Sequence, residues 1–361
     1  MRILHVTPFY EPFWAYGGMA RASAALCRAL AERGHAVTVA TALLGEDAPR
    51  EAVEGGVHVH RFPGPGTTAR FLFPLARGFS RFLRARLGSF DVVHVQGHRN
   101  GLAVAAWRAV SAAGSPWLLS PAGTFPHHGQ RTLLKSLFDR ILGARMVNEA
   151  WALVAVSESE ARDLPRPAQV IPNGVEACGT APSKPPAGSR PRLLFVGSDR
   201  PQKRGHLLAP LLSMIPEADL DLVGSCGPAF GSLFASTENR VAVRGVLSGD
   251  DLAAAYAAAD LLVHPAVGEA FGLVPFEAAL AGTAAVVAGG HGCGEWYGRA
   301  GGCVAPPDDV AALAGAVRER LRNRELAAEE ARQVAEFTKA HLTWAAAAKA
   351  FESAYQGLER G

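Results

Sequence analysis

The stretch His264–Gly282, HPAVGEAFGLVPFEAALAG, lies between two short apolar runs, LLVHP and TAAVVAG. Aliphatic runs without polar alternation are typical of strands that are buried on both faces of a parallel sheet. Pro275 fits only the first turn of a helix, which predicts a helix that begins near Gly272 to Val274 and follows a loop. The stretch therefore indicates the strand, loop and helix unit of an α/β fold.

Two carboxylates belong to this unit. Glu277 falls in the first helical turn, and Glu269 lies in the loop at the carboxyl end of the strand, where open α/β sheets bind their ligands. The backbone N–H groups of Phe271, Gly272 and Leu273 have no intrahelical acceptor and suit the oxygens of a phosphate or a sugar. The plain alternative is a glutamate that favours the helix dipole beside an exposed loop glutamate.

Glu269 and Glu277, with seven residues between them, resemble the E-x7-E signature of retaining glycosyltransferases of the GT-B fold, and more narrowly of family 4. The resemblance implies an α/β chain of two facing Rossmann-like domains, with parallel sheets and an interdomain cleft. It implies transfer of a sugar from a nucleotide-diphosphate sugar to an acceptor hydroxyl. In this scheme Glu277 holds the nucleotide ribose and Glu269 the sugar hydroxyls.

The length of 361 residues exceeds what one core usually covers, so the sequence predicts two domains. By the resemblance, residues 1–170 form the acceptor domain and residues 191–342 the donor domain. Residues 171–190, rich in proline, serine and glycine, read as a linker. The last helix, within 343–361, is expected to return to the first domain.

Composition narrows the class of protein. A hydrophobic fraction of 49% with 19% charged residues is that of a globular chain, and a net charge of +3 is too small to indicate nucleic acid. The five cysteines have no C-x-x-C spacing, which predicts a reduced compartment and no structural zinc. Without a recognisable signal peptide or spanning segment, we expect a cytoplasmic protein. Peripheral contact with the inner face of the membrane stays open.

Gly17 and Gly18 open the first helix of the chain, without a G-x-G-x-x-G motif. That absence disfavours a dinucleotide-dependent dehydrogenase. The pair resembles the glycines with which family 4 enzymes bring the backbone close to the donor phosphates. A flexible turn is the simpler interpretation.

Residues 70–87, RFLFPLARGFSRFLRARL, predict one or two basic helices, with Arg77, Arg81 and Arg84 at helical spacing beside phenylalanines. Such a helix either lies on anionic lipid or is the solvated face of an ordinary packing helix. The acceptor is accordingly a lipid-linked compound or a soluble sugar.

The acceptor side of the site is predicted from polar residues in two loops. His98 and Arg99 lie beyond the end of a core strand at residues 91–95. Many family members have a histidine after the next Ser-Pro pair, where this chain has Ala122. His127 or His128 is the expected substitute.

The loop GSDRPQK resembles the family pattern G-R-x-x-P-x-K, whose arginine and lysine neutralise the donor diphosphate. Gly197, Pro201 and Lys203 match it, but Ser198 stands at the arginine position. Arg200 lies two residues further on and is the predicted replacement. We therefore expect Lys203, Arg200 and Glu269 to carry catalysis.

The remaining expectations follow from the resemblance. Val246 and Leu247, after a further strand, would frame the nucleobase. Without a D-x-D motif, no metal or other cofactor is expected. The proposed pathway is synthesis of a cell-surface polysaccharide or glycolipid. A nucleotide-sugar epimerase on the same fold and a non-catalytic binding module are the alternatives.

Overall fold

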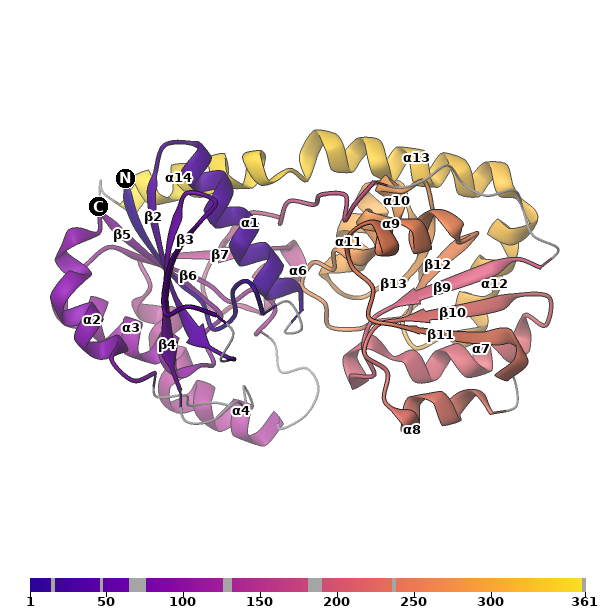
Figure 1. Ribbon diagram of the computed structural model, residues 1–361, viewed down its shortest axis with the longest axis horizontal. Helices are drawn as coiled ribbons and strands as arrows, with labels where there is room; N and C mark the ends of the chain where they lie inside the picture. The colour runs from indigo at the N-terminus through magenta and orange to yellow at the C-terminus, as the bar shows by residue number, and fades with distance from the viewer. Residues whose placement is uncertain are drawn as a thin grey trace. The chain divides into compact units, whose positions relative to one another are not determined.

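The computed structural model describes residues 1–13, 17–45, 48–64, 76–125, 132–180, 190–235 and 238–358. The chain forms two compact units (Figure 1): unit 1 is Met1–Gly174 with Trp344–Gly361, and unit 2 is Val175–Thr343. No helix in the described ranges is both long and apolar enough to span a bilayer.

Unit 1 is built on an eight-stranded sheet in the order β3-β4-β2-β1-β5-β6-β7-β8. All neighbours run parallel except the β3 and β4 hairpin. The strands are β1 (Arg2–Val6), β2 (Ala36–Leu43), β3 (Glu51–Glu54), β4 (Val57–Pro63), β5 (Val92–Gln96), β6 (Trp117–Ser120), β7 (Ala152–Ala155) and β8 (Gln169–Val170). The sequence did not predict β3, because its four residues, EAVE, are too polar to read as a core strand.

Helices cover both faces of this sheet. On one face α1 (Gly18–Glu32) lies beside α14 (Trp344–Leu358), and both pack on residues such as Ile3 and Val37. The other face, with Leu4 and Val95, is covered by α2 (Phe79–Arg86), α3 (Gly101–Ala113), α4 (Thr132–Phe138) and α5 (Ala144–Glu149). In the structure a π-helical segment, Asp139–Gly143, joins α4 to α5. The short α6 (Glu158–Asp163) follows β7.

Unit 2 has six strands, all parallel, in the order β11-β10-β9-β12-β13-β14. They are β9 (Arg192–Val196), β10 (Asp219–Val223), β11 (Val241–Gly245), β12 (Leu261–His264), β13 (Ala285–Ala288) and β14 (Cys303–Ala305). The helices are α7 (Leu208–Met214), α8 (Pro228–Gly231), α9 (Gly249–Ala258), α10 (Val274–Leu280), α11 (Gly292–Arg299), α12 (Val310–Arg322) and α13 (Arg324–His341). The prediction that a helix begins near Val274 is confirmed.

Each sheet reverses its strand order once among its central strands. The reversal lies between β1 and β5 in unit 1 and between β9 and β12 in unit 2. Loops that leave a parallel sheet in opposite directions at such a point open a crevice at the carboxyl ends of the strands, where these folds bind ligands. In unit 2 the two loops are those that carry Lys203 and Glu269. The predicted parallel α/β architecture is confirmed.

Candidate active site

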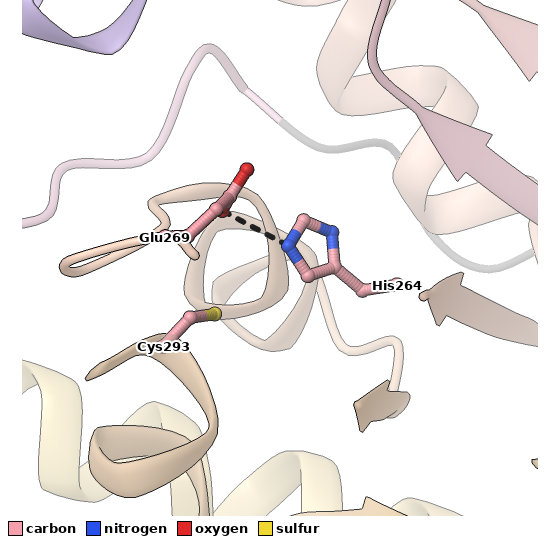
Figure 2. A group of neighbouring side chains, drawn as sticks. All are labelled: His264, Glu269 and Cys293. Atoms are coloured by element: carbon pink, nitrogen blue, oxygen red, sulfur yellow. Dashed lines mark hydrogen bonds and ion pairs between the residues drawn. The ribbon is translucent and has the colours of Figure 1, made fainter. Parts of the chain in front are cut away.

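Glu269 is the centre of the site in unit 2. It follows β12, and one carboxylate oxygen accepts a hydrogen bond from Lys203 Nζ, in the short helical turn Pro201–Lys203 after β9. The other oxygen, Oε2, lies 3.0 Å from His264 Nε2, at the last residue of β12 (Figure 2). The two loops at the strand reversal are therefore joined by one charge pair.

The charges around Glu269 together change its pKa more than its burial does. Loss of solvent alone would raise the pKa of this carboxyl group, but the neighbouring Lys203 and His264 hold the pKa well below its ordinary value. The side chain is 13% exposed. Glu269 is thus an ionised acceptor of hydrogen bonds at the carboxyl edge of the sheet.

Gly272 lets the loop close around Glu269. Its φ of +75° lies in the left-handed region that favours glycine. A Cβ there would lie 2.5 Å from Cys293 Sγ and 2.6 Å from Glu269 Oε2. The N–H groups of Phe271, Gly272 and Leu273 donate to no other group in the described part of the chain. The loop keeps these donors available beside the carboxylate.

Glu277 lies in the first turn of α10 and is buried. Its Oε2 accepts a hydrogen bond of 2.9 Å from the hydroxyl of Tyr256 on α9, which the sequence did not single out. Tyr256 is fully buried, so the bond holds the carboxylate in one orientation.

The loop after β9 is shaped by two glycines. A Cβ at Gly224 would lie 1.8 Å from the carbonyl oxygen of Gly197, so the two backbones touch where the loops after β9 and β10 leave the sheet. Ser198 is half-buried and Arg200 is exposed. The Arg200 side chain pairs with no other residue in the described ranges. A role for Arg200 at the donor stays a prediction.

Two further donor-side expectations concern backbone and surface positions. Val246 is 75% exposed and Leu247 is half-buried, directly after β11. Gly17 is the N-cap of α1, with φ of +94°, and Gly18 is its first residue. A Cβ at either glycine meets nothing within 4 Å, so only the conformation of Gly17 calls for glycine.

In unit 1, His98 and Arg99 are both directed to Asp139. His98 Nε2 lies 3.0 Å from Asp139 Oδ1, and Arg99 donates to both carboxylate oxygens. Burial opposes ionisation of Asp139, but the hydrogen bonds from His98 and Arg99 lower its pKa to about 2. No local pattern indicated this partner, which lies 40 residues after Arg99. Contact of His98 or Arg99 with an acceptor stays a prediction.

The expected histidine substitutes cannot be placed. His127 and His128 lie outside the described residues. Ala122, at the position of the family histidine, has a left-handed φ of 51°. A different histidine, His94 on β5, is buried between Tyr355 and Ser120, with ring nitrogens 2.8 and 2.9 Å from their hydroxyls. Burial lowers its pKa well below the usual value, so it is a neutral core residue.

One group of side chains in the described ranges has the composition of a metal site. His264, Glu269 and Cys293 offer ligand atoms within 4.8 Å of one another (Figure 2), and this donor set suits Zn²⁺. However, Lys203 already neutralises Glu269, and burial raises the pKa of the Cys293 thiol well above its usual value. The arrangement therefore works as a lysine–carboxylate pair and fits a metal poorly.

Comparison with known proteins decides the family. Residues 16–177 match the model of Glycosyltransferase Family 4, and residues 190–323 match that of Glycosyl transferases group 1. The chain is 30% identical over 339 residues to a D-inositol 3-phosphate glycosyltransferase of Salinispora arenicola, covering 79% of this chain and 75% of the relative. The chain belongs to glycosyltransferase family 4. The resemblance seen in Glu269 and Glu277 is thereby confirmed.

Solved structures agree with a family 4 fold. Sucrose-phosphate synthase from Thermosynechococcus elongatus superposes with a TM-score of 0.83 at 21% identity, over 100% of this chain and 99% of that one. HepE from Anabaena, in complex with UDP and glucose, gives 0.76 at 18% identity over 99% and 100%. The chain therefore has the GT-B fold. By its membership of family 4 it is a retaining glycosyltransferase that uses a nucleotide-sugar donor.

Proposed function

We propose that this enzyme adds a sugar to an acceptor hydroxyl during synthesis of a polysaccharide or glycolipid on the cytoplasmic side of the membrane. The observation that carries the proposal is the Lys203–Glu269 pair at the strand reversal of unit 2. Glu277 would hold the ribose, Glu269 the sugar hydroxyls, and Lys203 with Arg200 the diphosphate.

The chemistry explains why a cation and a carboxylate lie together at this site. Transfer needs positive charge at the departing diphosphate and hydrogen-bond acceptors at a sugar that becomes oxocarbenium-like. A donor diphosphate would attract the Lys203 ammonium, and a sugar hydroxyl would donate to Glu269. Because each group is held by the other, both are positioned at the carboxyl edge of the sheet.

A screen of UDP-, GDP-, ADP- and TDP-sugars by thermal shift tests the donor side. A ligand at about 100 times its dissociation constant adds about 2.7 kcal/mol to the free energy of unfolding. With the donor identified, the transferase should release nucleoside diphosphate only when an acceptor is present. Conversion of the donor alone would favour the epimerase, and binding without turnover across an acceptor panel would favour the binding module.

Peripheral contact with an anionic membrane is the second part of the proposal. The basic helix α2 supports it only by charge, because Phe79 and Leu83 are buried in the core of unit 1. Helix α4 and the π-helical segment that follows give better support for membrane contact. Their exposed apolar side chains are Leu133, Leu134, Leu137 and Ile141, which are 86%, 50%, 54% and 56% exposed. Arg140 is exposed beside them, while Asp139 points into the core.

Replacing Leu134 and Leu137 together with serine should weaken binding to vesicles of anionic phospholipid by about tenfold or more, because burial of a leucine contributes about 1.5–3 kcal/mol. Vesicle sedimentation measures the loss. Val243→Ser, which removes a 57% exposed valine from unit 2, is the matched control. Equal binding by the double variant and the control would exclude α4 as the contact.

A further inference from the structure

A hollow of about 560 Å³ lies between the end of β4 and the start of α2 in unit 1. Its lining residues are Arg50, Pro63, Gly64, Arg77, Gly78 and Arg81. Three of the six are arginines and none is acidic. The size is that of a site for a small molecule or for one group of a larger ligand.

The three arginines have no counter-charge in the described part of the chain. Arg50, Arg77 and Arg81 are exposed and form no ion pair with another described side chain. Arg61 of β4 is different, because it is buried and bonded to both oxygens of Glu54. Cations gathered around one hollow repel each other, and a bound anion would relieve that repulsion.

The hollow has a rigid wall. Phe62 of β4 packs against Phe79 of α2, with ring centroids 5.1 Å apart, and Phe79 is buried. This contact holds α2 on the sheet. Arg81 lines the hollow from the first turn of α2, and Arg77 lines it from the residue before the N-cap Gly78. Gly78 is the N-cap of α2 and has a left-handed conformation. The start of the eight-residue helix therefore adds a partial positive charge.

We propose that this hollow binds a phosphate group carried by the acceptor. Arginine guanidinium groups match phosphate oxygens in pairs of parallel hydrogen bonds. The hollow also lies at the carboxyl ends of the parallel strands β2 and β4, the edge where such sheets bind substrates. The assignment of the phosphate to the acceptor rests on the proposed function. The binding of phosphate does not.

The test uses inorganic phosphate as the probe, with binding followed by calorimetry at constant ionic strength against chloride. Combined Arg77→Gln and Arg81→Gln should weaken phosphate binding by at least about 10- to 150-fold, which is the value of one charge-assisted hydrogen bond. Arg84→Gln is the matched control, because Arg84 is an exposed arginine of the same helix that does not line the hollow. Where inorganic phosphate binds the native protein, equal loss in the control, or no loss in the double variant, would overturn the proposal.

Vesicles distinguish the two sources of phosphate. Binding of inorganic phosphate that depends on Arg77 and Arg81 indicates a soluble phosphorylated acceptor. If free phosphate does not bind, arginine-dependent binding to phosphatidylcholine vesicles that contain phosphatidic acid, and not to those without it, indicates a lipid headgroup. Binding of neither probe rejects the site. Nucleoside diphosphate binding by the double variant separates this result from the proposed function. It should be unchanged, because neither Arg77 nor Arg81 is among the predicted donor contacts.

Discussion

Glu277→Gln should weaken binding of the free nucleoside diphosphate by about 10- to 150-fold, whereas Glu269→Gln should leave that binding nearly unchanged and lower kcat by a similar factor. The physical reason is that the two carboxylates are predicted to hold different parts of the donor. Ribose hydroxyls are present in the free diphosphate, but the sugar hydroxyls are not. Calorimetry with the diphosphate and initial rates with the complete donor measure the two effects.

The controls for this pair follow from the partners of each carboxylate. Glutamine at position 277 still accepts the hydrogen bond from Tyr256, so the fold around α10 should persist. Glutamine at position 269 leaves Lys203 without its charge partner, so thermal unfolding must be recorded beside the rates. Glu325→Gln, an exposed change on α13, provides the matched control. Near-normal kinetics in both site variants would show that this loop is assigned wrongly.

The sequence located the loop and helix because their signals are local. Pro275 determines where α10 begins, and the apolar runs on either side predict β12 and β13. The position of Glu269 relative to the sheet follows from these elements alone. The same reasoning placed the last helix, since Trp344–Leu358 is apolar at helical spacing.

Pairings across the chain were not predictable in this way. Lys203 and Glu269 were expected to act on separate parts of the donor, yet they are bonded to each other. His264 appears in the sequence as the end of an apolar strand, and its polar character at that position was the one available signal. Asp139 interrupts an apolar helix, but nothing local indicates that His98 and Arg99 reach it. Such contacts depend on which strands are neighbours.

The basic segment shows a different limit. Arg77 was predicted at helical spacing with Arg81 and Arg84, but α2 begins at Phe79 and leaves Arg77 before the helix. Arg77, Arg81 and Arg84 look alike in the sequence, as do the apolar residues between them. The structure separates them, since Phe79 and Leu83 are buried while Arg77 and Arg81 line a hollow that Arg84 does not. A helical repeat gives the side of a helix, but the neighbouring strand determines what that side contacts.

Arg200→Ala should lower kcat/KM by roughly 10- to 150-fold, and Lys203→Met should lower it at least as much, because a charge-assisted contact to phosphate contributes about 1.5–3 kcal/mol. Ser198 stands where the family has an arginine, so a diphosphate held by Lys203 alone would be under-neutralised. The exposed, unpaired Arg200 is the nearest replacement. Ser198→Arg should therefore restore part of the activity in the Arg200→Ala background.

Lys203→Met and Arg200→Ala should differ in how the free energy of unfolding depends on pH. In the native protein the lowered pKa of Glu269 gives stability that is present above its ordinary value of 4.5 and is lost as the pH falls through the lowered pKa. In Lys203→Met the ammonium is gone while burial and His264 remain, so the pKa of Glu269 should be lowered less and this contribution to stability should shrink. Urea unfolding across a pH series should show a weaker loss of stability at low pH for Lys203→Met than for the native protein, and no such change for Arg200→Ala. If Arg200→Ala is silent in kinetics while Lys203→Met is severe, one cation suffices for the diphosphate. If neither changes kcat/KM, this loop takes no part in catalysis, and the binding-module alternative gains support.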